Sequence, residues 1–305
     1  MEIITYTKEL KLDRETAVAI GKFDGVHKGH RRLLSEIIRK KEQGLMACVL
    51  TFDPAPAAFF GLSDGRELTT REEKYLLFER MGIDVVVEFP MTKISASMEP
   101  ETFAAEVLKD SLQAAYICAG TDLSFGAGGK GNAALLYSLQ EKLGFTVETI
   151  DKVSVEGKVV SSTYARELLE QGEMEALSQY LDMPYMIVGE VVHGKRLGRN
   201  LGFPTINLLP DEKKLLPPNG VYYAKVLYKG KEYRAISNIG YKPTVTQEHI
   251  RGIETYLYDF NEEIYGEYVE ISLLKFKRPE RRFESVEALK MQLFRDIEEG
   301  KEYDL

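Results

Sequence analysis

Two histidines three positions apart, His27 and His30, lie in the segment AIGKFDGVHKGHRRLL at residues 19–34. Gly25 and Gly29 beside them permit a tight backbone and the close approach of a ligand. A helix is expected to open at the second histidine, and the N–H groups at the start of a helix attract anions. Two imidazoles at this point are able to hydrogen-bond phosphate oxygens and to stabilise negative charge that builds up at phosphorus. The spacing therefore favours an anion site over a simple turn.

A metal site is disfavoured here because no third nitrogen or sulfur ligand lies nearby in the sequence. The surrounding first half alternates short, nearly continuous apolar runs with helical patterns, which predicts a doubly wound parallel α/β sheet. The expected strands are Ala17–Phe23, Ala47–Asp53, Asp84–Phe89, Ala114–Gly120 and Phe145–Ile150. The expected helices are Arg31–Gln43, Arg71–Met81, Glu101–Lys109, Asn132–Leu143, Thr163–Glu170 and Met174–Leu181. Ligands of such sheets bind beyond the carboxyl ends of the strands, where the two histidines lie.

Beyond the segment LDMPY at 181–185 the pattern changes to short strands with partial alternation. The expected strands are 185–194, 203–209, 220–229, 231–239, 250–260 and 268–277. A terminal helix is expected to present one apolar face, with Ser285 as N-cap, formed by Val286, Leu289, Leu293 and Ile297. Six short strands predict a small closed antiparallel barrel with a C-terminal helix. The predicted domains are therefore 1–182 and 183–305.

The composition is that of a soluble globular chain of 305 residues, with a net charge of −8 that disfavours nucleic acid and anionic membranes as partners. No apolar run approaches the ~20 residues of a membrane span, and the first residues do not resemble a signal peptide. Cys48 and Cys118 lie in predicted strands and are interpreted as reduced core thiols. We therefore expect a cytoplasmic protein that is a monomer or a weak homo-oligomer.

Several motifs, in order along the chain, resemble the bacterial bifunctional riboflavin kinase/FAD synthetases. GKFDGVHKGH contains the HxGH core of the wider nucleotidyltransferase superfamily, AGTDLSFGAGGKGN at 119–132 resembles the family's flavin loop, and SSTYAR at 161–166 resembles its S-S-T-x-x-R motif. GRNLGFPTINL at 198–208 is similar to the kinase signature, and SNIGYKPT, IETYLYDF, IYG and FESVEALKMQLFRDI follow in the family's order. The resemblance spans residues 18 to about 297.

For the first half, this resemblance implies an FMN adenylyltransferase, in which the FMN phosphate attacks the α-phosphorus of ATP to give FAD and pyrophosphate. It implies that His27 and His30 are catalytic. It implies an ATP and phosphate site formed by Phe23, Asp24, Gly25, His27, His30, Ser161, Ser162, Thr163 and Arg166. It implies flavin contacts from Asp122, Phe125, Gly126 and Asn132. Where the family commonly has P-H-P this chain has Ala55, and the loss of one charge-assisted contact costs about 1.5–3 kcal/mol.

For the second half, the resemblance implies a riboflavin kinase that uses ATP, with Glu254 as catalytic base. It implies an ATP and Mg²⁺ site formed by Gly194, Lys195, Gly198, Arg199, Gly202, Phe203, Pro204, Thr205 and Asn207, with Thr205 and Asn207 as metal ligands. It implies flavin contacts from Asn238, Glu254 and Asp259. Two oxygen ligands alternating onto one strand face suit Mg²⁺. A carboxylate in a mostly apolar strand is expected to have a raised pKa, which suits proton abstraction.

Several alternatives remain open. The G-x-G-x-x-G match at 126–131 is typical of dinucleotide oxidoreductases, but it follows the fourth predicted strand rather than the first. A chain with Ala55 is also consistent with a kinase whose adenylyltransferase half is weakened. A flavin-binding regulator without activity, and a nucleotidyltransferase for another phosphate substrate fused to an unrelated barrel, are further hypotheses. The presence of both motif sets disfavours these last two.

Overall fold

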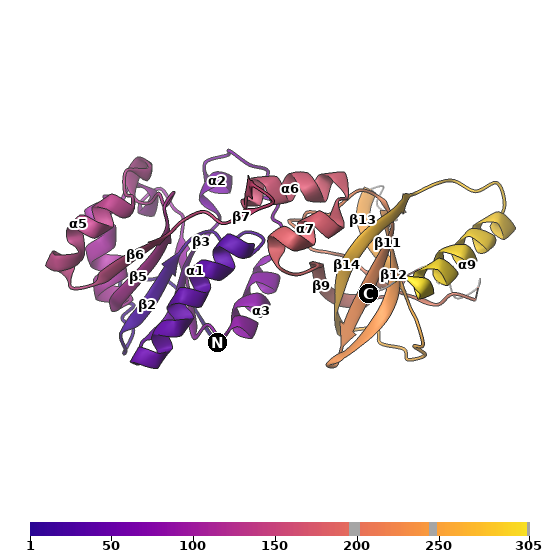
Figure 1. Cartoon of the computed structure of the whole chain (residues 1–305), viewed down its shortest axis with the longest axis horizontal. Coiled ribbons are helices and arrows are strands. Elements are labelled where there is room, and N and C mark those ends of the chain that lie inside the picture. Colours follow the sequence, from indigo (N-terminus) through magenta and orange to yellow (C-terminus); the bar gives the residue numbers. More distant parts are fainter. Residues whose placement is uncertain (195–201, 244–248, 304–305) are drawn as a thin grey trace. The chain divides into compact units, whose positions relative to one another are not determined.

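The computed structural model describes residues 1–194, 202–243 and 249–303 (Figure 1). By their internal contacts the residues form two compact units, Met1–Ser162 and Thr163–Leu305, and each is described by itself. This structural division falls before two short helices that the sequence assigns to the first domain, so the predicted boundary between 182 and 183 stays a prediction. None of the helices in the described ranges has both the length and the apolar character that crossing a membrane requires.

The first unit is built on a six-stranded parallel sheet, which confirms the predicted doubly wound architecture. Its strands are β1 (Glu2–Thr5), β2 (Thr16–Ile20), β3 (Met46–Asp53), β4 (Val85–Pro90), β5 (Ala114–Gly120) and β6 (Thr146–Ile150). They lie in the order β1-β4-β3-β2-β5-β6. The sequence predicts all but β1. That strand has four residues and little burial, so it lacks the apolar run by which the others are found.

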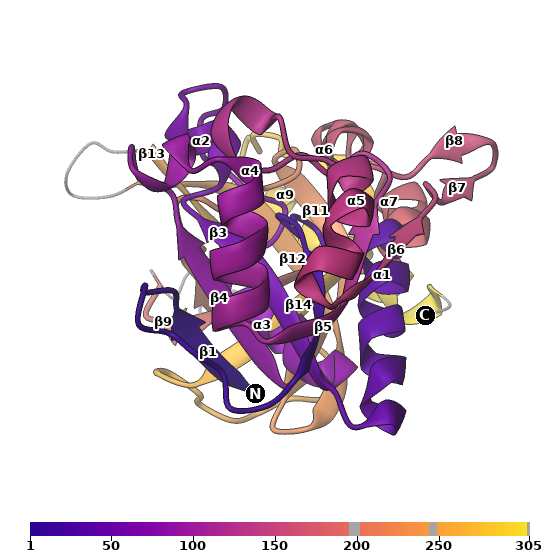
Figure 2. The same cartoon turned by 90° about the vertical axis from the view of Figure 1, so that its left-hand side faces the viewer.

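Helices cover both faces of this sheet. They are α1 (Lys28–Arg39), α2 (Pro56–Phe59), α3 (Arg71–Met81), α4 (Pro100–Thr102), which continues as a π-helix over Phe103–Ser111, and α5 (Ala133–Leu143). Figures 1 and 2 show α1 and α3 on one face and α5 with the π-helix on the other. A short hairpin, β7 (Ser154–Val155) and β8 (Lys158–Val159), follows β6.

The strand order reverses between β2 and β5, which are hydrogen-bonded neighbours at the centre of the sheet. From β2 the chain continues through α1 to β3 on one side, whereas from β5 it continues through α5 to β6 on the other. The carboxyl ends of two strands that diverge in this way form the usual ligand crevice of an open α/β sheet. The loops that leave the sheet at this crevice contain the two histidines and the glycine-rich segment 121–132.

The second unit contains the predicted closed antiparallel barrel with its C-terminal helix. After α6 (Ser162–Gln171) and α7 (Met174–Leu181) come β9 (Tyr185–Val192), β10 (Thr205–Leu208), β11 (Gly220–Tyr228), β12 (Lys231–Pro243), β13 (His249–Leu257) and β14 (Tyr268–Pro279). The barrel order is β10-β13-β12-β11-β14-β9. Helix α9 (Val286–Glu302) follows, with Ser285 as N-cap as predicted.

Only the C-terminal half of α9 packs closely on the barrel. Ile297 is buried, and the hydroxyl of Tyr258 donates to its carbonyl at 2.6 Å. Asp296 is 1% exposed and accepts hydrogen bonds from Arg278, from Nε at 3.2 and 3.0 Å and from Nη2 at 2.6 Å. The predicted apolar face is wrong at its first position because Val286 is 57% exposed. The helix is therefore fixed at one end by a buried ion pair rather than by a continuous apolar stripe.

Candidate active sites

The loop that follows β2 is held in place by the segment that precedes α3. Asp24 is buried, and its Oδ1 accepts hydrogen bonds from the amides of Leu68 at 2.7 Å and Thr69 at 3.4 Å. The amide of Gly25 donates to Thr69 Oγ1 at 3.0 Å. These bonds fix the backbone of the loop before it enters α1, so Asp24 and Gly25 have a structural role at the site.

The same loop contains two non-glycine residues in the left-handed backbone region. Phe23 has φ 53° and Val26 has φ 41°, and both side chains are fully buried. A backbone conformation of this kind costs about 1–3 kcal/mol per residue and is characteristic of functional sites. Here it turns the chain from the end of β2 onto the start of α1, which brings the histidines to the crevice.

His27 is the N-cap of α1, so the helix begins three residues earlier than predicted and at the first histidine, not the second. Its Nδ1 accepts from the amide of His30 at 3.3 Å, and the two rings stack with centroids 3.7 Å apart. A β-carbon on Gly29 would lie 3.3 Å from the His27 ring, which explains the glycine between them. Since Nδ1 accepts a hydrogen bond, a neutral His27 carries its proton on Nε2.

Both histidines are neutral at pH 7. Burial lowers the pKa of His27 to about 4, although Asp24 and Asp122 act in the opposite direction. Burial, together with the neighbouring His27 and Lys74, holds the pKa of His30 well below its ordinary value. Neutral imidazoles donate hydrogen bonds to phosphate but bring no positive charge into the buried loop. Cationic groups elsewhere must therefore balance the phosphate charge.

The structure brings part of the S-S-T-x-x-R segment to the same loop. Ser162 Oγ donates to the carbonyl of Asp24 at 2.9 Å, and Ser161 is half-buried beside it in the chain. Thr163 and Arg166 lie on α6, in the second unit.

The glycine-rich loop after β5 divides into residues that build the loop and one exposed acidic residue. Phe125 is buried, forms paired backbone hydrogen bonds with Gly131 and packs on Phe103. Gly126 lies against Pro100, where a β-carbon would come within 2.8 Å, and Asn132 caps α5 through Leu135 at 3.0 Å. Asp122, in contrast, is exposed, pairs with Lys152 at 3.0 Å and acts electrostatically on His27.

Ala55 lies directly after β3, the strand that neighbours β2 in the sheet, and occupies the N-cap position of α2. Ala55, which replaces the family's histidine, therefore lies at the same edge of the sheet as His27 and His30. The methyl group of Ala55 offers no hydrogen bond there.

In the barrel, strand register places three candidate residues in one row. Asn207 on β10 is opposite Glu254 on β13, which is opposite Asn238 on β12. Residues directly opposite in antiparallel strands share one face of the sheet. Asn238 also donates to Glu280 at 3.3 Å, an acidic residue that the sequence analysis does not single out.

The expected apolar surroundings of Glu254 are wrong. Its side chain is exposed, whereas its neighbours Ile253 and Thr255 are fully buried on the opposite face. The strand is apolar in composition, but alternation directs the apolar side chains into the barrel and the carboxylate away from it. Glu254 is therefore accessible from solvent.

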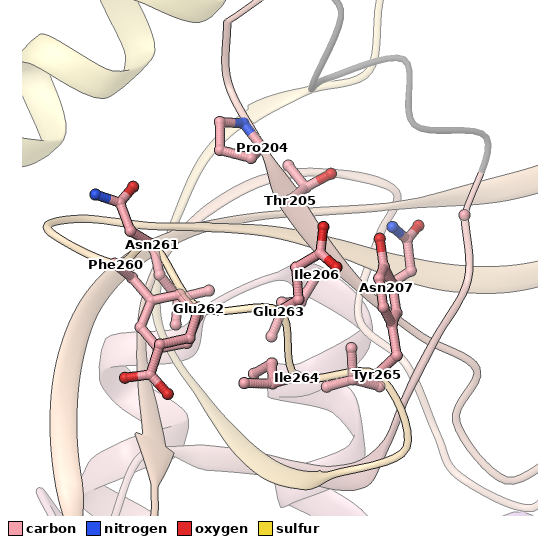
Figure 3. Close-up of a pocket in the computed structure, with 13 residues that line it drawn as sticks. Pro204, Thr205, Ile206, Asn207, Phe260, Asn261, Glu262, Glu263, Ile264 and Tyr265 are labelled. Atoms are coloured by element: carbon pink, nitrogen blue, oxygen red, sulfur yellow. The ribbon is translucent and has the colours of Figure 1, made fainter.

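A cavity of about 210 Å³ lies beside β10 and contains the predicted Mg²⁺ ligands (Figure 3). It is lined by Val191, Gly194, Pro204, Thr205, Ile206, Asn207, Leu257 and the segment 260–265. Thr205 and Asn207 present oxygen atoms to it, and Glu262 and Glu263 come from the facing segment (Figure 3). A β-carbon on Gly194 would overlap the side-chain amide of Asn207, so only glycine leaves room for the amide here.

These donors fit an oxygen-preferring cation that shares its coordination with a nucleotide. Within residues 1–194, 202–243 and 249–303, no three or more His, Cys, Asp or Glu side chains form a group that would hold a metal. Segment 260–265 is not predicted as a site from the sequence, where its only signals are the two acidic residues before Ile-Tyr-Gly.

The remaining kinase residues are less well grouped. Lys195, Gly198 and Arg199 lie outside the described residues. Gly202 and Phe203 precede the cavity, and the Phe203 ring contacts Tyr256. Asp259 lies in the turn beyond the end of β13, with a φ of 53°, and acts electrostatically on Lys301.

Fold and sites together define a two-domain protein, an α/β unit and a β-barrel unit with one candidate active site in each. A family model described as FAD synthetase matches residues 9–164, and one described as riboflavin kinase matches residues 181–303. A Bacillus subtilis protein named bifunctional riboflavin kinase/FMN adenylyltransferase is 34% identical over 95% of this chain and 92% of its own length. The chain belongs to this bifunctional riboflavin kinase/FMN adenylyltransferase family.

Other relatives agree in length and arrangement. The Escherichia coli K12 protein of the same name is 33% identical over 94% of this chain and 92% of its own. A crystal structure of a Streptococcus pneumoniae protein, named a macrolide-efflux protein, superposes with a TM-score of 0.88 at 28% identity and covers all of both chains. The two-unit architecture is therefore found in a solved structure as well.

Proposed function

We propose that the protein makes flavin cofactors in two steps: it phosphorylates riboflavin with ATP to give FMN, then transfers adenylate from a second ATP to FMN, giving FAD and pyrophosphate. The main support for this function is that one chain contains both sites. One is the stacked histidine pair at the crevice of the sheet, and the other is the Asn207–Glu254–Asn238 row beside the barrel cavity. Relatives named for both activities span nearly the whole chain.

In the first unit, adenylyl transfer is a displacement at the α-phosphorus of ATP, in which positioning and electrostatic stabilisation supply the catalysis. His27 and His30 donate from Nε2 to oxygens on that phosphorus and stabilise the charge that develops there. Ser161, Ser162, Thr163 and Arg166 hold the departing pyrophosphate. Asp122 is placed to contact the flavin substrate, whereas Phe125, Gly126 and Asn132 shape its loop.

In the barrel, Glu254 accepts the proton of the ribityl 5′-hydroxyl as that oxygen attacks the γ-phosphorus of ATP, whose bond to the bridging oxygen breaks to release ADP. Thr205 and Asn207 would hold Mg²⁺ together with the ATP phosphates, and the bound ion would supply positive charge that offsets the phosphate charge. The exposure of Glu254 supports this role because a base must reach a bound substrate. Asn238 lies beside it in register and positions the flavin.

We place the functional boundary between residues 182 and 183. The two family matches, which end at 164 and begin at 181, support it. We also place the enzyme in the cytoplasm, since Cys48 and Cys118 are free and buried.

The experiment that tests this function incubates purified protein with riboflavin, ATP and Mg²⁺ and resolves the flavins by chromatography over time. FMN followed by FAD is the expected result. FMN alone, even after fresh FMN and ATP are added, would show that Ala55 and its surroundings do not support adenylyl transfer. Bound flavin without any product would leave a flavin-binding protein.

A further inference from the structure

One face of α3 packs against the histidine loop and brings a buried lysine to it. Lys74 and Phe78 are one turn apart, so they share a face of the helix. The Phe78 ring contacts Phe23 edge-on at 5.6 Å, and Phe23 contacts the His30 ring at 5.2 Å. Lys74 is only 9% exposed. A lysine so placed sits beneath the site rather than on a solvated face.

Glu67 pairs with this lysine. Lys74 Nζ lies 3.1 Å from Glu67 Oε2, and neither side chain is more than 20% exposed. A buried ammonium persists when a carboxylate compensates for its lost hydration. Glu67 directly precedes Leu68 and Thr69, the residues that bind Asp24. The ion pair and the clamp on the histidine loop are thus parts of one connected segment.

His30 has a buried polar atom that the contacts described so far leave unused. Its Nδ1 is buried and has no hydrogen-bond partner among the residues that the structure describes. Lys74 is near enough to act on the charge of the ring. A nearby cation favours the lone pair over the proton on the nitrogen that faces it, and the ring proton then occupies the other nitrogen.

We propose that Lys74, held by Glu67, is a positioning residue for adenylyl transfer: it keeps Nδ1 of His30 unprotonated, so that the ring's proton stands on Nε2. The N-cap bond already imposes the same tautomer on His27. The two stacked rings then present matching N–H donors to the phosphate. This inference rests on the proposed function of the first site.

The test uses the full-length chain labelled with ¹⁵N at histidine, of which there are only four. Lys74→Gln retains a hydrogen-bond donor for Glu67 but removes the charge, whereas Lys74→Arg retains the charge. Lys41→Gln is the matched control, because Lys41 also pairs with a carboxylate, Asp84, in the same unit. ¹⁵N chemical shifts of the imidazoles at pH 7.5 report which nitrogen carries the proton.

We expect His30 as the Nε2–H tautomer in wild type, K74R and K41Q, and a mixture or the Nδ1–H form in K74Q. We expect the kcat for FMN to FAD to fall at least tenfold in K74Q and to recover in K74R. Riboflavin phosphorylation, catalysed by the other unit, measures the amount of folded protein and stays unchanged. An unaltered tautomer in K74Q would overturn the inference. Absence of FAD synthesis in wild type would instead overturn the proposed function. The tautomer measurement would still decide whether Lys74 sets the tautomer of His30.

Discussion

Replacing His27 by Asn is expected to make the first unit less sensitive to acid. Burial lowers the pKa of His27 to about 4, against an ordinary value of 6.5 for histidine. Between these values the unfolded chain binds more protons than the folded one, so stability falls as the pH falls from about 6.5 towards 4. Each unit of pKa difference is worth about 1.4 kcal/mol. The free energy of unfolding therefore falls by up to ~3 kcal/mol because of His27, and by ~2 kcal/mol at pH 5.

Asparagine is chosen because it caps helices well and does not titrate, so α1 keeps its N-cap. Urea denaturation of wild type and H27N at pH 7.5, 6 and 5, followed by circular dichroism, gives the free energies of unfolding. Between pH 7.5 and 5 the wild type is expected to lose ~2 kcal/mol more than the variant. His193→Asn, in the other unit, controls for the removal of a histidine. Equal acid losses in wild type and H27N would refute the buried, neutral state of His27.

Two further predictions concern the barrel unit. Gly194→Ala places a methyl group where Asn207 Nδ2 now lies. The kcat/KM for ATP in FMN formation is therefore expected to fall at least tenfold, while conversion of FMN to FAD is unchanged. Normal kinase kinetics would contradict the role of Asn207. Asp296→Asn breaks a buried ion pair with Arg278 and is expected to destabilise the barrel unit by about 3–5 kcal/mol in urea. A loss under 1 kcal/mol would mean that the pair does not fix α9.

The sequence is informative about the sheet because its central strands are buried on both faces and therefore read as continuous apolar runs. β1 is missed because a short, exposed strand leaves no such run. The start of α1 is misplaced because the capping group is the imidazole of His27, whereas sequence rules expect serine, threonine, aspartate or asparagine.

The sites divide in a similar way. Spacing and strand position are enough to predict that His27 and His30 lie together, as their stacked rings do, because helix geometry fixes their distance. The environment of Glu254 is predicted wrongly because composition does not reveal which face of a strand a side chain occupies. Lys74 is missed because a lysine among charged neighbours usually lies on a solvated helix face, and its burial depends on how α3 packs against a loop distant in sequence.

We propose that the two active sites of this chain work independently. The most direct measurement assays Glu254→Gln for both half-reactions, supplying riboflavin and ATP in one vessel and FMN and ATP in another, with Mg²⁺ in each. The account predicts that FMN formation is abolished while FAD forms from FMN at close to the wild-type rate. A folded variant in which both reactions fail, or in which riboflavin is still phosphorylated, would contradict it.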